Sequence, residues 1–183
     1  MSALSRTALA GFAVLSGAFA LAAPVSEPPS YRMSDYRGPT PATVDGQQGL
    51  TTAEAHQLWA SGKAAFVDVL PRAPKPANLL PGTVWREKPH SDIPHSIWLP
   101  DTGYGALPPE TEAYFRRGLE QASGGKKDAT LVIYCLRDCW MSWNATKRAK
   151  SMGYGHVFWY PEGSDGWAEA GNPVELRQPL KRD

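Results

Sequence analysis

The chain has 183 residues, a formal net charge of +1 at neutral pH, 42% hydrophobic residues and seven tryptophans. This length fits one modest domain with extensions, and the apolar content is sufficient for a core. Lysines and arginines do not gather in one block, which argues against nucleic acid as a partner because such proteins usually carry a basic stripe.

The first residues have the features of an export signal. In MSALSRTALAGFAVLSGAFALAAP a single basic residue, Arg6, precedes an apolar run from Ala8 to Leu21, and the stretch closes with a small-x-small pattern. These are the marks of a secretory signal peptide, and the run is too short for a stable membrane span. We therefore predict that residues 1–22 are removed, that no membrane span remains, and that the protein works in a periplasm, where disulfides can form. A retained membrane anchor is the alternative.

An irregular arm is expected next. Residues 23–49 are rich in proline, serine and glycine and lack helical or strand periodicity. Such a composition is typical of an extended arm or linker. Tyr31 and Tyr36 are its candidates for contact with a domain.

Regular structure is predicted from residue 50 to residue 178, followed by a short tail over 179–183. The first helix is marked by Thr51 and Glu54, which form a capping box, and by Gly62 as a stop. In a capping box each side chain satisfies a free backbone N–H group at the helix start.

Helices and short apolar strands then alternate. The expected strands are AAFVDVLP, SIWL, ATLVIY and HVFWY, and the further helices are PPETEAYFRRGLEQA, the segment after Cys139, and GWAEAGNPV. In the segment after Cys139, Met141, Ala145, Ala149 and Met152 fall on one helical stripe. This alternation implies an α/β domain with a central, mostly parallel sheet flanked by helices.

The order of these segments resembles a rhodanese-like domain over roughly residues 50–174. AFVDVLP stands where rhodaneses carry a strand ending in Asp-x-Arg, and IPHSIWLP resembles their Ile-Pro-Gly-Ala…Pro segment. LVIYC matches the strand that delivers their active-site cysteine. SMGYGHVFWYPEGSDGWAEAGNPV matches the leucine-glycine-tyrosine, valine, glycine and tryptophan pattern that closes the domain.

Within that superfamily, the loop CLRDCW and the arm segment SYRMSDYRGPTPAT resemble a narrower group, the PQQ-dependent catabolism-associated proteins with a cysteine-pair-plus-tryptophan (CXXCW) motif. The resemblance implies a periplasmic protein that works alongside a PQQ-dependent dehydrogenase and its cytochrome c acceptor.

The resemblance also places Cys135 at the centre of a strand-to-helix loop whose N–H groups converge on one point. Such a loop favours an anion, and it lowers the thiol pKa of the cysteine below the free value of about 8.5. Cys135 and Cys139 are the predicted catalytic residues. The residues expected to form the anion-binding cradle are Leu136, Arg137, Asp138, Trp140, Met141 and Ser142.

The loop departs from both known active types of the fold. Aligned on Ser142, it is one residue longer than the sulfurtransferase loop, a length that resembles rhodanese-fold phosphatases and arsenate reductases. Those enzymes grip the oxyanion with an arginine where this chain has Met141, and Asp138 puts negative charge where phosphate would bind. A phosphatase is therefore not predicted.

A second thiol changes the expected sulfur chemistry. Cys139 would attack a persulfide on Cys135, release sulfide and close a disulfide, which favours a dithiol cycle over simple sulfur transfer. The geometric requirement is that the two Cα atoms come within about 7 Å. The alternative is a permanent structural disulfide, although so short a loop gains less from a bridge than a long one.

A non-catalytic binding module is the competing hypothesis. Cys135, Cys139 and Met141 offer soft sulfur ligands suited to Cu(I), with His90, His95 and His156 as candidate distant ligands. Trp140 and Trp143 flank the loop, either packed in the core or forming an aromatic wall for a docking partner. The leading hypothesis remains an exported rhodanese-like protein that uses its cysteine pair for thiol–disulfide or sulfur-transfer chemistry.

Overall fold

The computed structural model describes residues 24–86 and 90–182. The expected signal peptide, residues 1–22, lies outside the described residues. Among the helices of the described ranges, none is long and apolar enough to cross a membrane.

A parallel sheet of four strands forms the centre of the domain, in the order β5-β3-β6-β7. Its strands are β3 (Ala64–Asp68), β5 (Ile97–Trp98), β6 (Thr130–Tyr134) and β7 (His156–Tyr160). The register places Asp68, the last residue of β3, opposite Tyr134, the last residue of β6. The predicted parallel α/β architecture is confirmed, and the carboxyl ends of β3 and β6 meet at one sheet edge.

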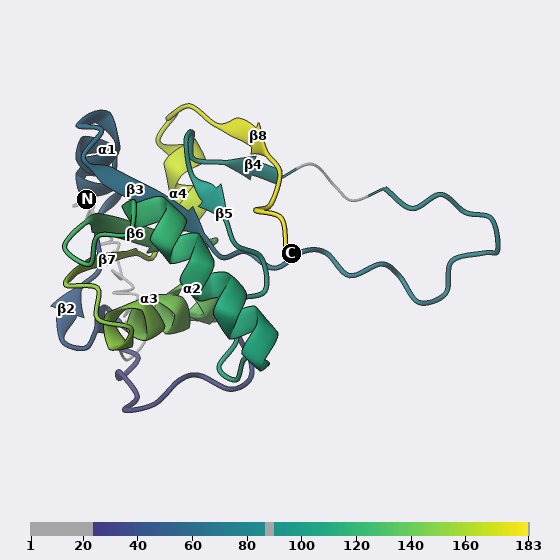
Figure 1. Cartoon of the computed structure of the whole chain (residues 1–183), viewed down its shortest axis with the longest axis horizontal. Helices are drawn as coiled ribbons and strands as arrows, with labels where there is room; N and C mark the ends of the chain where they lie inside the picture. The colour runs from purple at the N-terminus through teal and green to yellow at the C-terminus, as the bar shows by residue number, and fades with distance from the viewer. Residues whose placement is uncertain (1–23, 87–89, 183) are drawn as a thin grey trace, which may run out of the picture.

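Four helices cover the two faces of this sheet. They are α1 (Thr52–Ala60), α2 (Pro109–Ser123), α3 (Trp140–Ser151) and α4 (Gly163–Glu169). Figure 1 shows α2 and α3 on the face toward the viewer, with α1 and α4 on the far side. The predicted capping box at Thr51 and Glu54 is present at the start of α1. The closing helix begins at Gly163, earlier than the sequence pattern indicated.

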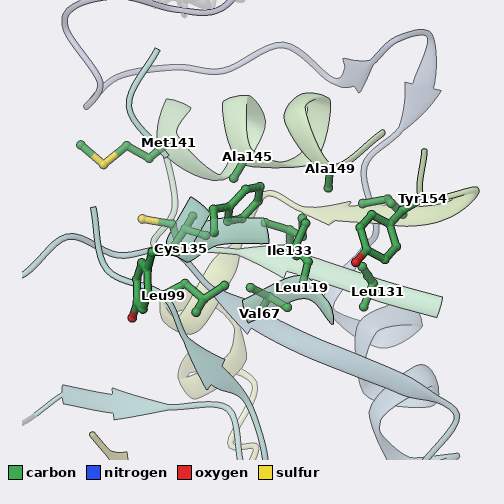
Figure 2. Close-up of a cluster of buried hydrophobic side chains, with 14 of the residues drawn as sticks. Val67, Leu99, Leu119, Leu131, Ile133, Cys135, Met141, Ala145, Ala149 and Tyr154 are labelled. Carbon is green, nitrogen blue, oxygen red and sulfur yellow. The ribbon is translucent and has the colours of Figure 1, made fainter. Parts of the chain in front are cut away.

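Alternating side chains along β6 build two separate cores. Leu131, Ile133 and the following Cys135 belong to the cluster under α2 and α3 (Figure 2). Val132 and Tyr134 belong to the cluster against α1 and α4. Successive residues of a strand point to opposite faces, so the position of Cys135 in the strand order assigns it to the first core.

The predicted helical stripe of α3 faces that first core. Ala145 and Ala149 are fully buried, Met141 is nearly so, and Met152 packs at the edge. Figure 2 shows Ala145 and Ala149 on the side of α3 that is turned toward the sheet. Small side chains at these positions let the helix lie close to β6.

The N-terminal arm is irregular, as predicted, and it is bonded along α3. The amide of Arg32 donates to Oδ1 of Asn144, and Nε1 of Trp143 donates to the carbonyl of Thr43. The arm ends in a small hairpin of β1 (Thr43–Val44) and β2 (Gln47–Gln48).

A second two-stranded sheet lies at the other side of the domain. It pairs β4 (His90–Asp92) with β8 (Glu175–Arg177) in antiparallel register. Between β3 and β4 the chain projects from the body as a long loop (Figure 1), on which Leu80 and Val84 are each 78% exposed.

Candidate functional site

The two cysteines lie in the loop that connects β6 to α3. Cys135 follows the last residue of β6, and Cys139 is the N-cap residue of α3. Their Cα atoms are 6.3 Å apart, and the two sulfurs are joined in a disulfide. This distance lies within the limit of about 7 Å between the Cα atoms of a disulfide.

Both members of the bridge are buried. Cys135 is 0% exposed and Cys139 2% exposed, and both belong to the apolar cluster under α2 and α3. Figure 2 shows Cys135 at one end of this cluster, beneath Met141. Burial in apolar surroundings disfavours the thiolate form of a cysteine. It also shields the sulfurs from solvent, so a reagent can reach them only after a local opening of the structure.

Two loop amides, those of Arg137 and Trp140, have acceptors within the protein in this disulfide form. The amide of Arg137 donates to Oδ2 of Asp165 at 3.1 Å, and the amide of Trp140 donates to the carbonyl of Tyr36 at 2.9 Å. An anion in this loop would have to displace the Asp165 carboxylate or the arm. These two N–H groups of the cradle expected around Cys135 are therefore not free for an anion in this state.

Arg137 is held away from the sulfurs by ion pairs with α4 and the residue before it. Its guanidinium bonds Glu169 through two nitrogens, at 2.6 and 2.9 Å, and Glu162 at 2.5 Å. The hydrogen bonds from Glu169 and then Glu162 raise the pKa of Arg137 above its ordinary value. Its positive charge is thus committed to these carboxylates.

Asp138 occupies the exposed tip of the loop with a left-handed backbone, φ 53°. Aspartate is one of the few residues besides glycine that adopts this conformation readily. Its carbonyl accepts a 2.9 Å hydrogen bond from the amide of Gly38. Asp138 therefore forms the turn of the loop and also binds the arm.

The other predicted loop residues have packing and capping contacts. Leu136 packs at the edge of the cluster that contains the cysteines, and Met141 is 6% exposed. The hydroxyl of Ser142 donates to the carbonyl of Cys139 at 3.0 Å and accepts from Nε1 of Trp159. Ser142 therefore ties the first turn of α3 to β7.

Trp140 and Trp143 pack beneath the arm. They are 4% and 0% exposed, their rings meet edge to face at 5.5 Å, and Nε1 of Trp140 donates to the carbonyl of Pro39. Of the two interpretations left open by the sequence, the structure supports core packing. An aromatic wall open to a partner is not formed while the arm is in place.

No metal-ligand cluster among the described residues includes a cysteine. His95 and His156 are exposed, whereas both cysteines are buried, and Nε2 of His90 is bonded to Asp68. A Cu(I) ion would need the reduced thiols, which this disulfide form does not offer.

A polar cluster beside the cysteine loop was missed by the sequence analysis. Asp68, at the end of β3, and Asp92, in β4, are both 0% exposed, and one ligand atom of each lies within 4.8 Å of a ring nitrogen of His90. The one sequence feature that pointed to this cluster is Asp68, an aspartate at the end of a buried strand. Its partners come from a strand too short to be recognised by periodicity.

The domain has a central parallel sheet, and Cys135 lies in the loop between one of its strands and the N-terminus of the next helix. This arrangement defines a class of α/β domains that carry a cysteine in a strand-to-helix loop. The chain belongs to the rhodanese-like domain family, whose model matches residues 51–170. No curated protein matches the chain.

Solved structures with a similar fold include three sulfurtransferases. A thiosulfate sulfurtransferase from Pseudomonas aeruginosa is 14% identical, with a TM-score of 0.47 over 72% of this chain and 20% of its own length. The polysulfide-sulfur transferase homodimer from Wolinella succinogenes is 17% identical, with a TM-score of 0.44 over 70% and 78% of the two chains. A human single-domain sulfurtransferase is 23% identical, with a TM-score of 0.39 over 66% and 95%.

Proposed function

We propose that this rhodanese-like protein uses Cys135 as a nucleophile and Cys139 as its resolving thiol, cycling between a dithiol and a disulfide during sulfur chemistry. One observation carries the proposal: the chain's only two cysteines lie in the single loop where the family presents its reactive sulfur, and they are already joined. A bridge over so few residues constrains the unfolded chain only weakly, which favours a chemical role over a purely stabilising one.

The position of Cys139 supports its role as the leaving thiol. As the N-cap residue of α3 it lies at the positive end of the helix dipole, which stabilises negative charge. When a partner thiolate attacks Sγ of Cys135, the S–S bond breaks and Cys139 departs as a thiolate. A second partner thiolate then attacks the partner sulfur of the mixed disulfide and releases Cys135. The pair gains two electrons, and the partner becomes a disulfide.

The same pair supports sulfane sulfur chemistry in the opposite direction. The Cys135 thiolate attacks the outer sulfur of thiosulfate, forms a persulfide and releases sulfite. The Cys139 thiolate then attacks Sγ of Cys135, closes the disulfide and releases hydrosulfide after uptake of one proton. Over the cycle the dithiol loses two electrons and the sulfane sulfur gains them.

The setting of this chemistry is part of the proposal. We infer export to a periplasm from the signal-like first residues, and work beside a PQQ-dependent dehydrogenase and its cytochrome c from the resemblance of CLRDCW and the arm. An oxidising compartment suits a protein that rests in the disulfide form.

A single-turnover experiment tests the division of roles. Reduced protein, freed of reductant, is mixed with thiosulfate, and sulfite, sulfide and the mass of the protein are measured. The wild type is expected to release sulfite and sulfide and to end as the disulfide. Cys139→Ser should release sulfite, retain one extra sulfur atom on Cys135 and give no sulfide.

Cys135→Ser is the matched control and should release neither product. Sulfide release from Cys139→Ser equal to that of the wild type would remove Cys139 from the cycle. Equal behaviour of all three proteins would remove the cycle itself.

A further inference from the structure

A buried group of three potential ligands lies at the sheet edge beside the cysteine loop. Asp68 ends β3, and His90 and Asp92 are two residues apart on β4, so their side chains point to the same face of that strand. One ligand atom from each of the three lies within 4.8 Å of the others. Nε2 of His90 is 2.7 Å from Oδ2 of Asp68.

One carboxylate oxygen in this group receives no hydrogen bond from a donor among the described residues. Both aspartates are 0% exposed. Asp68 uses Oδ1 to accept from the amide of Leu70 and Oδ2 to bond His90, and Asp92 uses Oδ1 to accept from the amide of Ile93. Oδ2 of Asp92 is buried without a hydrogen bond to any described residue. A buried acceptor without a partner is costly, and buried charges in proteins are paired or coordinate metals.

The nearby cation, Arg177, divides its charge between this group and another acid. Arg177 lies opposite His90 in the β4–β8 pair, and its Nη2 is 2.5 Å from Oε1 of Glu175. Its Nε, like Oδ2 of Asp92, is buried without a hydrogen-bond partner among the described residues. Two carboxylates therefore face one imidazole, and the one arginine that acts on Asp92 is already paired with another acid.

We propose that Asp68, His90 and Asp92 bind a divalent transition-metal ion of the zinc class. Two carboxylate oxygens and one imidazole nitrogen form a ligand set that Zn²⁺ accepts. The nitrogen ligand favours such an ion over Mg²⁺ or Ca²⁺, which take oxygen ligands. The His90 side chain is 11% exposed, so the group is open to solvent on the side of His90. A metal ion can enter from that side, and water molecules there can complete its coordination.

The ion would attach β4, which follows a long projecting loop, to the main sheet. β4 comes after the loop that leaves the body at the end of β3, and its strand partner is only β8 (Figure 1). A metal ion shared by Asp68 and Asp92 joins β4 to the end of β3 in the main sheet. The site uses no sulfur ligand, so it is chemically separate from the cysteine pair.

Zinc binding to the purified protein tests the proposal. After chelator treatment and removal of the chelator, with the disulfide intact, Zn²⁺ is added in competition with a chromophoric chelator. The wild type is expected to bind about one Zn²⁺ per chain, and Asp92→Asn and His90→Ala to bind at least about 10-fold more weakly. His156→Ala, which removes an exposed histidine on β7, should bind as the wild type does.

A double variant, Cys135→Ser with Cys139→Ser, identifies the source of any binding. It should retain the wild-type affinity, and loss of binding in this variant would assign the ion to the sulfurs and overturn the proposal. Absence of binding by the wild type, or unchanged binding by Asp92→Asn, would do so too.

Nuclear magnetic resonance of the wild-type imidazoles gives a readout that does not depend on the folding of a variant. Added Zn²⁺ should shift the ring signals of His90 and leave those of His156 in place. Unchanged His90 signals would show that Zn²⁺ does not bind at this group and would overturn the proposal.

Discussion

The carbonyl oxygen of Tyr36 accepts a 2.9 Å hydrogen bond from the amide of Trp140, the first residue of α3. The arm thereby occupies an N–H group at the helix N-terminus, immediately after Cys139. Together with the bond from the Gly38 amide to the Asp138 carbonyl, this contact makes the arm a cover for the cysteine loop. Access to the disulfide should therefore depend on how firmly the arm is held.

Asn144→Ala tests this dependence. Asn144 bonds the amide and the carbonyl of Arg32 at 2.9 Å each and the carbonyl of Gly103 at 3.0 Å. Loss of these bonds leaves the part-buried backbone groups of Arg32 and the buried carbonyl of Gly103 without this partner, at a cost of about 1–3 kcal/mol. We expect faster reduction of the disulfide by dithiothreitol, measured by timed alkylation, because the arm opens more often. Ser151→Ala, on the exposed end of α3, is the control. Equal reduction rates for the two variants would mean that the arm does not limit access.

Gly163→Ala should disturb the loop from the opposite side. Gly163 has φ 54°, and a Cβ atom there would lie 2.2 Å from the carbonyl oxygen of Cys135. Gly171 has φ 73° and open space around the corresponding position. Gly171→Ala should cost about 1 kcal/mol from backbone strain alone. Gly163→Ala should cost clearly more because of the added clash. Urea unfolding measures both, and equal losses would show that the loop can move away without penalty.

Asp92 should make stability depend on pH in the metal-free protein. Burial, followed by the neighbouring Asp68 carboxylate, raises the pKa of Asp92 from 3.8 to about 9. The folded state then holds a proton that the unfolded chain releases, so this contribution to stability is full below the unfolded pKa and is lost as pH rises toward 9. Urea unfolding in chelator at pH values between about 5 and 9 should show this decline. Asp92→Asn should flatten it, and an identical slope in the variant would contradict the assignment.

Reduction of the disulfide should leave the domain folded. In the chain-entropy model, a bridge over so few residues contributes about 2 kcal/mol. The parallel sheet and both cores remain after it is cut. Urea unfolding with and without reductant should show a lower midpoint and an unchanged far-ultraviolet circular dichroism spectrum before the transition. Loss of that spectrum on reduction would indicate that the pair holds the fold together.

The sequence predicted those features that depend on local patterns. The capping box of Thr51 and Glu54 and the stripe of Ala145 and Ala149 specify α1 and α3, because helix signals lie within a few residues of each other. The alternation of Leu131 and Ile133 with Val132 and Tyr134 is likewise local, and it determines the face on which Cys135 lies.

Two features that depend on distant segments were not predicted. The strands β4 and β8 have three residues each and are far apart in the chain, so neither shows a period of its own. The cluster of Asp68, His90 and Asp92 depends on that pairing. Binding of the arm to Asn144 was not visible either, since an asparagine in a helix gives no indication of a partner more than a hundred residues away.

The proposed dithiol–disulfide cycle depends most on whether the buried sulfurs can react. Cys135 is fully buried in the disulfide form, so the bridge is either a protected redox pair or an inert link. The equilibrium between the two forms distinguishes these cases because a structural disulfide resists reduction by glutathione.

The reduction potential of the Cys135–Cys139 pair is therefore the most direct test. The protein is equilibrated in a graded series of reduced and oxidised glutathione, and its thiols are counted by alkylation and mass. The account predicts a potential above about −300 mV, within the range of exchanging dithiols. A potential well below that value would mark a permanent structural bridge and contradict the proposed cycle.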